Sequence, residues 1–314
     1  MKYAVIRRNG LGDFISATVP LCNYIRMRDK EAQLILFMSP QNIRLVKYFF
    51  DDVSCNVIRS GNKYFEAVKT ALICRWMRPD VGIAPVPAYN KLNALFLRTL
   101  GCDEVYGVNT GGGIEKLLLT HISNVNRENH VALQTIQALN SDIRSIDPSW
   151  YPVMNQERIK LYQFGQNGKA RLIVEVSNHR PTSQLANEKL ANILNDLSKR
   201  IDFTVVITLR PGYEETAKKL SGQLQMPNEI CLTPSLDDFI SLVNGCDVFL
   251  FGDGGAAHIA GALGKRGVAL YGITSVEKWK VLSDKVIHIY HERDVNEIQD
   301  QKIKQSLSSV FELL

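Results

Sequence analysis

The sequence lacks the cysteine patterns that hold small extracellular domains or zinc sites together. Its six cysteines are scattered, no Cys-x-x-Cys occurs, and no histidine pair with ligand spacing accompanies them. Several cysteines lie in apolar runs, where a small buried thiol is the usual role. Neither a disulfide framework nor a structural zinc site is expected. No acidic pair or histidine cluster predicts another bound metal.

Long hydrophobic runs are also missing. No apolar stretch is long enough to cross a bilayer, and the N-terminus has no hydrophobic segment before a small-residue cleavage site. Residues 1–7 already have the pattern of a buried strand. These absences predict a soluble, cytoplasmic protein.

The sequence has an excess of positive charge only in its first half. The formal net charge is +5; residues 1–150 hold 18 Lys and Arg against 13 Asp and Glu, and the remainder balances at 19 against 19. The excess indicates an anionic partner or a membrane surface on that side. Scatter over a solvated surface explains so small an excess equally well. No nucleic-acid partner is expected.

Strands and helices alternate along the chain, with no internal repeat. A length of 314 residues predicts two domains. The proline-bracketed segment 147–152 is the best linker, which gives domains 1–150 and 151–314. Expected strands are 3–7, 33–38, 55–58, 80–84, 105–108, 171–176, 203–209, 229–232 and 285–290. Expected helices are 41–50, 64–77, 90–100, 130–140, 187–199, 214–224, 236–245 and 295–314. Ser235 to Asp238 has the pattern of a capping box at the start of the 236–245 helix. The pattern predicts two doubly wound α/β domains, with 111–113 as a loop.

The stretch from Phe249 to Gly272 is the most informative. It contains an apolar strand, the turn Gly252-Asp253-Gly254-Gly255, a helix of small residues and a second apolar strand. Glycines after an acid let a ligand approach the backbone, and helix N–H groups favour a phosphate or carboxylate there. An ordinary turn with close packing is an equally good interpretation of the pattern alone.

The first predicted strand ends in a second turn with an acid, Gly10-Leu11-Gly12-Asp13. Asp13 stands at the natural N-cap of the next helix, where its carboxylate would accept backbone N–H bonds. From the residues alone, this capping role is preferred over a catalytic one. Pro20 is expected to kink or split the helix.

With these residues described, the chain resembles glycosyltransferase family 9, typified by the lipopolysaccharide heptosyltransferases. Three segments carry the resemblance: 10–13 with Pro20, Asp253 to Gly264 with its His258, and 268–274 with the later Trp279. The second is similar to the family signature Asp-(Ser/Thr)-Gly-x-x-His-x-x-x-Ala-Leu-Gly. The match spans nearly the whole chain.

The chain departs from the family pattern at several positions. Gly254 replaces the usual Ser or Thr, Arg266 a proline, and Ile273 the proline of Gly-Pro-Thr. The phosphate-binding lysine of the family is missing, and Arg180 is the nearest cation able to replace it as a bidentate donor. These changes bear on the identity of the sugar nucleotide more than on the fold.

The resemblance implies a GT-B fold, in which two Rossmann-like domains face each other across a cleft, the first on the acceptor side and the second binding the nucleotide sugar. It implies metal-independent, inverting transfer of a sugar, most simply heptose from ADP-heptose, to a lipopolysaccharide core-type acceptor, with no cofactor. Asp13 is the implied base. The expected binding residues are Gly12, Arg180, Glu214, Pro234, Leu236, Asp253, Gly254, Gly255, Ala256 and His258.

In this interpretation Arg180 and the helix start at Gly254–Ala256 hold the diphosphate, Asp253 and less strongly His258 bind sugar hydroxyls, and Glu214 accepts from the ribose. The partners are a nucleotide sugar and an anionic glycolipid, with a peripheral contact to the inner face of the inner membrane. Three alternatives stay open: another nucleotide sugar, a protein acceptor, or a catalytically silent nucleotide-sugar-binding protein.

Overall fold

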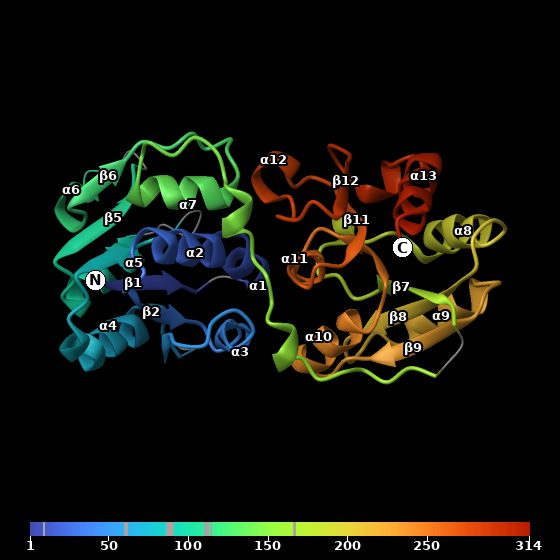
Figure 1. Cartoon of the computed structure of the whole chain (residues 1–314), viewed down its shortest axis with the longest axis horizontal. Coiled ribbons are helices and arrows are strands. Elements are labelled where there is room, and N and C mark those ends of the chain that lie inside the picture. The colour runs from blue at the N-terminus through green and yellow to red at the C-terminus, as the bar shows by residue number, and fades with distance from the viewer. Residues whose placement is uncertain (9, 60–61, 86–90, 110–112, 114, 166–167) are drawn as a thin grey trace. The chain divides into compact units, whose positions relative to one another are not determined.

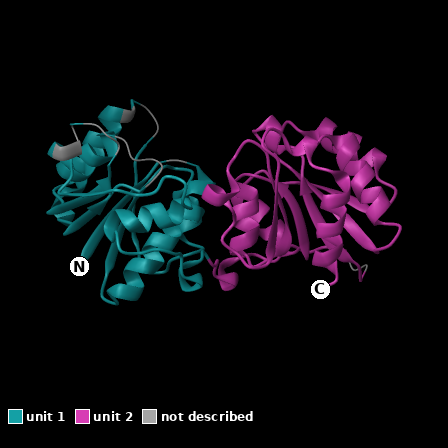
Figure 2. Cartoon of the chain, turned by 90° about the horizontal axis from the view of Figure 1, so that it is seen from above, with its two compact units in different colours: residues 1–152 teal, residues 153–314 magenta. Residues whose placement is uncertain are grey.

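The computed structural model describes residues 1–314 except 9, 60–61, 86–90, 110–112, 114 and 166–167. Part of the expected 111–113 loop therefore lies outside the described residues. The chain divides into two compact units, Met1–Pro152 and Val153–Leu314, coloured separately in Figure 2. The sequence analysis placed the boundary after residue 150. Each unit is described by itself.

The first unit is built on a six-stranded parallel sheet of order β3-β2-β1-β4-β5-β6 (Figure 1). Its strands are β1 (Lys2–Arg7), β2 (Gln33–Met38), β3 (Ser54–Val57), β4 (Val81–Ile83), β5 (Glu104–Val108) and β6 (His121–Ser123). Because β side chains alternate between faces, Ala4 and Ile6 point into one helical layer and Arg7 into the other.

Helices cover both faces of this sheet. They are α1 (Leu11–Asp13), α2 (Val19–Arg28), α3 (Ile43–Val46), α4 (Lys63–Cys74), α5 (Lys91–Leu100), α6 (Glu115–Leu118) and α7 (Val131–Leu139). On the Ala4 face, α4 and α5 form one hydrophobic core with β1 and β2. The other face takes the segment that begins at Leu11, to which Arg7 is hydrogen-bonded through Thr18.

The second unit repeats the plan with order β12-β11-β10-β7-β8-β9, again all parallel. Its strands are β7 (Ala170–Glu175), β8 (Phe203–Leu209), β9 (Asn228–Leu232), β10 (Val248–Gly252), β11 (Arg266–Tyr271) and β12 (Val286–Tyr290). Its helices are α8 (Asn187–Leu197), α9 (Glu214–Gln223), α10 (Leu236–Asn244), α11 (Gly255–Ala262), α12 (Val276–Trp279) and α13 (Asp300–Phe311).

The expected elements are confirmed with three corrections. The helix expected over 41–50 is reduced to α3, because turns occupy both of its ends. Three short elements were not expected, the four-residue helices α6 and α12 and the strand β6. β6 is three residues long and lies at the edge of the sheet beside β5, so little pattern marks it. The final helix begins at Asp300 rather than 295, since residues 295–297 form a separate 3₁₀ turn.

Both sheets have the strand order 3-2-1-4-5-6 when numbered within their own unit, which is the order of dinucleotide-binding folds. In such sheets the order reverses between the first and fourth strands, and ligands bind at the carboxyl ends of those two strands. The switch points are β1/β4 in the first unit and β7/β10 in the second. The predicted α/β class with two doubly wound domains is confirmed.

Candidate functional site

In the second unit, the turn after β7 is seated against the ends of β10 and β11. A Cβ on Gly252 would lie 1.6 Å from the backbone oxygen of Ser183, and one on Gly272 would lie 2.4 Å from that of Thr182. No side chain fits at either position. The two glycines therefore let the 3₁₀ turn Pro181–Ser183 contact the strand ends directly and fix the residues just before it at the switch point.

Arg180 and Asp253 meet at this switch point, one after β7 and the other after β10. Arg180 Nη1 donates to Asp253 Oδ2 at 2.5 Å and to Thr274 Oγ1 at 3.4 Å. Asn178 Nδ2 donates to the backbone oxygen of Asp253 at 3.1 Å, which ties the two turns together. A guanidinium has five N–H donors, and the Arg180 side chain is 58% exposed. It can therefore hold Asp253 and still present donors to a ligand.

The Asp253 carboxylate is nearly enclosed, since its side chain is 5% exposed. Burial raises the pKa of Asp253, while the hydrogen bond from Thr274 and the charge of Arg180 oppose that rise. The cation thus makes the buried carboxylate tolerable as an ion.

Helix α11 begins at Gly255, two residues after Asp253, as the Gly-Asp-Gly-Gly pattern predicts. Gly254 is its N-cap and provides no side chain that accepts from the first turn. Gly254, Gly255 and Ala256 are all partly exposed. The first N–H groups of an eight-residue helix consequently face an accessible edge, where an anion is favoured.

His258 lies within α11, in the interior of the unit, and is 4% exposed. Burial, His288 and Arg180 lower the pKa of His258 to about 4, so the ring is neutral at pH 7. Its placement suits a packed, neutral imidazole; binding of sugar hydroxyls by His258 stays a prediction.

Glu214, Pro234 and Leu236 lie on the far side of β7 from Asp253. Glu214 is the first residue of α9, and its carboxylate accepts from the backbone N–H of Gly212 at 2.9 Å. Pro234 and Leu236 follow the edge strand β9. Between them, Ser235 and Asp238 form the predicted capping box of α10.

Sequence reasoning missed a second cation at this edge, Arg210, which follows β8. Its guanidinium donates to the backbone oxygen of Ser177 and contacts His179 Nε2. It also lies close enough to Glu175 to oppose the rise in that residue's pKa caused by burial. The sequence pattern that could have identified Arg210 was a basic residue directly after a buried strand.

In the first unit, the predicted base lies at the β1/β4 switch point. The N-cap of α1 is Gly10, so the expectation that Asp13 caps the helix is wrong. Asp13 and Gly12 lie within the first turn and are both partly exposed. The helix continues through a π-helical turn, Phe14–Thr18, into α2, and Pro20 stands at the start of α2. The helix thus changes its hydrogen-bonding pattern just before the proline instead of breaking there.

A buried arginine that the sequence analysis did not single out supports this turn. Arg7 is fully buried at the end of β1, and its Nε donates to Thr18 Oγ1 at 2.9 Å. Burial lowers the pKa of Arg7 to about 10, and the negative charge of Asp13 opposes the shift. Arg7 is therefore charged at neutral pH, and the attraction favours the charged form of both partners.

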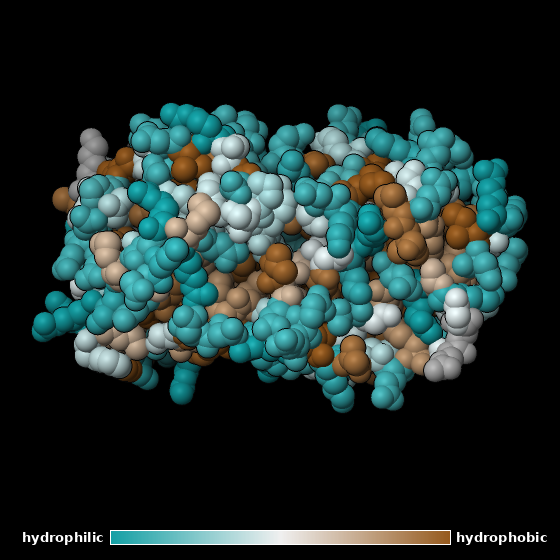
Figure 3. All heavy atoms as spheres, viewed as in Figure 1, coloured by the Kyte–Doolittle hydropathy of each residue, from teal (hydrophilic) through white to brown (hydrophobic). Residues whose placement is uncertain are grey.

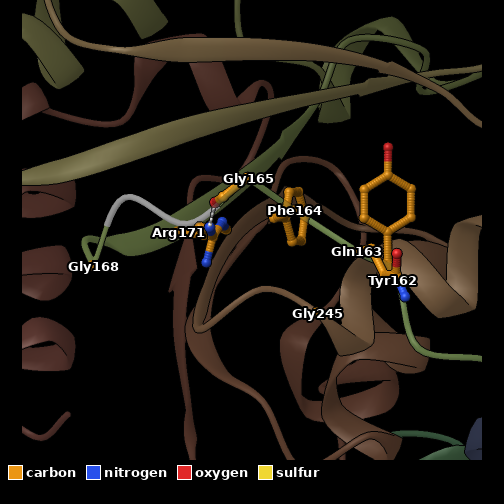
Figure 4. A pocket seen from close by; sticks show the side chains of 7 residues that line it. All are labelled: Tyr162, Gln163, Phe164, Gly165, Gly168, Arg171 and Gly245. Carbon is orange, nitrogen blue, oxygen red and sulfur yellow. Dashed lines mark hydrogen bonds between the residues drawn. The ribbon is translucent and has the colours of Figure 1, made fainter.

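A separate hollow of about 700 Å³ lies elsewhere in the second unit. Figure 4 shows Tyr162, Phe164 and Arg171 around it, with Gly245 at the end of α10. Arg171 lies near the start of β7, whereas Arg180 follows its end. Six strand residues span roughly 20 Å, so this hollow is at the opposite edge of the sheet from the candidate site.

Among the residues that the structure describes, no three or more His, Cys, Asp and Glu side chains converge as metal ligands would. Within the same part of the chain, no helix combines the length and hydrophobicity needed to cross a bilayer.

Comparison with known proteins decides the family of the second unit. Residues 178–309 match the model of glycosyltransferase family 9 (heptosyltransferase). They carry a family 9 glycosyltransferase domain. The matched range includes Arg180, Asp253 and α11, so the site described above lies within it. The recognition of family 9 and the prediction of a glycosyltransferase are confirmed.

The whole chain is similar in fold to several solved structures. The family 9 glycosyl transferase of Veillonella parvula has a TM-score of 0.81 at 12% identity, with 100% of this chain and 97% of that chain covered. ADP-heptose lipopolysaccharide heptosyltransferase II of E. coli has a TM-score of 0.77 at 17% identity, with 100% of this chain and 99% of that chain covered. E. coli heptosyltransferase WaaC with ADP has a TM-score of 0.75 at 12% identity, with 99% of this chain and 100% of that chain covered. Among curated proteins, none matches in sequence.

Proposed function

We propose that this glycosyltransferase moves a sugar from a nucleotide sugar, most simply heptose from ADP-heptose, to a lipopolysaccharide core-type glycolipid. The observation that carries the proposal is the family 9 domain whose switch point joins Arg180, Asp253 and the start of α11. One similar E. coli structure contains ADP and another ADP-2-deoxy-2-fluoro heptose, which supports an ADP-sugar as the donor.

We assign donor binding to the second unit. A nucleotide diphosphate carries negative charge that grows as it leaves the sugar, and Arg180, Arg210 and the α11 N–H groups are suited to stabilise it. Asp253 would hold sugar hydroxyls from its buried position. Glu214 would accept from the ribose, and the backbone around Pro234 and Leu236 would contact the base.

We assign the base to the first unit. Inverting transfer needs a carboxylate that takes the proton of the acceptor hydroxyl as its oxygen attacks the anomeric carbon and the diphosphate departs. Asp13 is suited to this role because the neighbouring Arg7 favours its ionised form. No step of the proposal uses a metal, so activity should be unchanged by EDTA.

The substitution Asp13→Asn tests the base. It keeps the shape of the side chain but removes its basicity, so kcat should fall at least about 10²-fold while ADP affinity and thermal unfolding stay unchanged. Asp103→Asn, at an exposed residue of the same unit, is the control.

Near-normal turnover in the Asp13→Asn enzyme would remove the base from the proposal. Titration calorimetry with ADP, UDP and GDP decides the donor class; preference for UDP or GDP would overturn the ADP-sugar. Absence of both transfer and donor hydrolysis at saturating enzyme would favour the silent binding protein.

A further inference from the structure

Helix α4 of the first unit has two different apolar faces. Its inner face is made of small residues, Ala67, Ala71 and Cys74, all buried in the core beneath the sheet. Large apolar residues would normally occupy that face. In α4 they lie on the other side and point into solvent.

The outer face consists of Phe65, Lys69, Leu72 and Ile73 on α4 and Trp76 in the 3₁₀ turn that follows it. We call these five residues the α4 surface. Phe65 is 63% exposed, Leu72 55% and Trp76 75%. The spacing 65, 69, 72, 76 is one helical stripe, so the side chains are neighbours. Exposed apolar groups that are contiguous mark an interaction site more often than isolated ones do.

Positive charge is interleaved with this stripe. The ammonium of Lys69 lies 6.0 Å from the centre of the Phe65 ring, and Arg75 and Arg78 are exposed beside Trp76. Glu66 is the one acid between residues 63 and 78. The visible face of this unit mixes hydrophobic and hydrophilic residues near α4 (Figure 3).

We infer that the α4 surface docks on an anionic lipid bilayer. Aromatic and aliphatic side chains of an amphipathic helix enter the boundary between headgroups and acyl chains, and flanking cations pair with anionic headgroups. A protein partner would not need both features on one stripe. The membrane contact expected from the charge excess of the first half is thereby given specific residues.

The inference extends the proposed function and rests on it in one respect: the membrane-bound acceptor explains why docking would be useful to the enzyme. Docking would bring the enzyme to the surface where a membrane-bound acceptor is held. The test measures binding to lipid without donor or acceptor, so docking and sugar transfer can fail separately.

The first experiment is sedimentation of the full chain with phosphatidylcholine vesicles, with and without phosphatidylglycerol. The double variant Phe65→Ser, Trp76→Ser should lose at least about tenfold in binding to the anionic vesicles, since two large side chains no longer leave water. Both residues are exposed, so thermal unfolding should be unchanged. Leu161→Ser is the matched control, because Leu161 of the second unit is 77% exposed.

Charge reversal tests the electrostatic part. Lys69→Glu should weaken binding to anionic vesicles by more than about fivefold and leave binding to neutral vesicles unchanged. Lys219→Glu, an exposed lysine on α9, should do neither.

Trp76 also reports its own position. Its emission should shift to shorter wavelength on anionic vesicles, and Trp76→Phe should remove the shift while vesicle binding persists. Trp150 is buried and Trp279 belongs to α12 of the second unit, so a shift that disappears in Trp76→Phe comes from Trp76.

Three outcomes would overturn the inference: no binding of the unmodified chain to anionic vesicles, full vesicle binding by the double variant, or equal loss in the Leu161 control. If the unmodified chain binds no vesicles but self-associates, and the double variant abolishes that self-association, the α4 surface belongs to a second copy of the chain. Calorimetry with ADP on the same variants should give wild-type affinity in every case, which keeps donor binding as a separate result.

Discussion

At the scale of single residues, the candidate site depends on opposite charges, each of which lowers the free-energy cost of burying the other. A buried carboxylate is costly as an ion, and Arg180 offsets part of that cost for Asp253. The opposite charges of Arg7 and Asp13 favour each other electrostatically in the first unit. In each pair one partner is buried and the other partly exposed, so a ligand can compete for or add to the exposed partner's bonds.

Arg180→Ala should impair both binding and stability. Loss of a charged hydrogen-bond donor to the diphosphate should raise the Kd for ADP at least about tenfold, measured by calorimetry. Arg180→Lys should recover part of the affinity, because lysine restores the positive charge but not the paired N–H donors of the guanidinium. Arg200→Ala, at an exposed arginine outside the site, is the control; equal affinity in all three variants would contradict the phosphate role.

The loss of stability in Arg180→Ala, relative to the unmodified protein, should depend on pH. The pKa of Asp253 is raised by burial, so ionisation destabilises the folded state at neutral pH, and the penalty disappears as pH falls through that pKa. Arg180 stabilises only the ionised form. Urea unfolding should therefore show a deficit of about 1–2 kcal/mol for Arg180→Ala at pH 7 that shrinks in acid. A deficit independent of pH would show that the pair is not responsible.

At the scale of elements, strand ends and helix starts are positioned by backbone contacts that only glycine permits. The end of β10 and the residue after β11 both contact the turn Pro181–Ser183. This contact places Arg180, which immediately precedes the turn, beside Asp253, which immediately follows β10.

Gly252→Ala should test this packing. The new methyl group would overlap the Ser183 oxygen, so the turn must move and unfolding free energy should fall by about 3 kcal/mol. Gly222→Ala is the matched control, since nothing lies within 4 Å of its Cβ position in α9; it should be neutral or stabilising by up to about 1 kcal/mol. Urea unfolding of both proteins measures the contrast, and an unaffected Gly252→Ala protein would contradict the contact.

At the scale of the whole molecule, each unit has its own hydrophobic core. Ile6, Phe37 and Phe96 belong to the core of the first unit, and Leu172, Leu194 and Ile303 to that of the second. Chains with separate cores need not unfold as a single cooperative body.

Calorimetric unfolding should therefore show two transitions, and ADP should shift only that of the second unit. At a hundred times its Kd, ADP should add about 2.7 kcal/mol to the stability of that unit. Hydrogen exchange assigns the effect: added protection is expected in β8 of the second unit and not in β2 of the first. Equal protection of both strands would contradict the assignment of donor binding to one unit.

The sequence by itself determined most of the elements and the resemblance to family 9 that residues 178–309 confirm. The boundaries of β2 and β8 match the sequence prediction residue for residue, and the strand–turn–helix motif at Asp253 and the capping box at Ser235 were also predicted. These features are local: alternation, turn residues and capping depend on neighbours along the chain. Strand β6, held by a single neighbour, carried too weak a pattern to be predicted.

Tertiary structure alone decided which groups meet and which face outward. Arg180 and Asp253 are 73 residues apart in sequence, and Arg210 reaches Ser177 and His179 only because β7 and β8 are adjacent. The apolar pattern of α4 does not indicate which stripe is buried. Packing of Ala67 and Ala71 against the sheet leaves Phe65 and Trp76 in solvent, because side-chain surroundings depend on contacts between elements that no local pattern encodes.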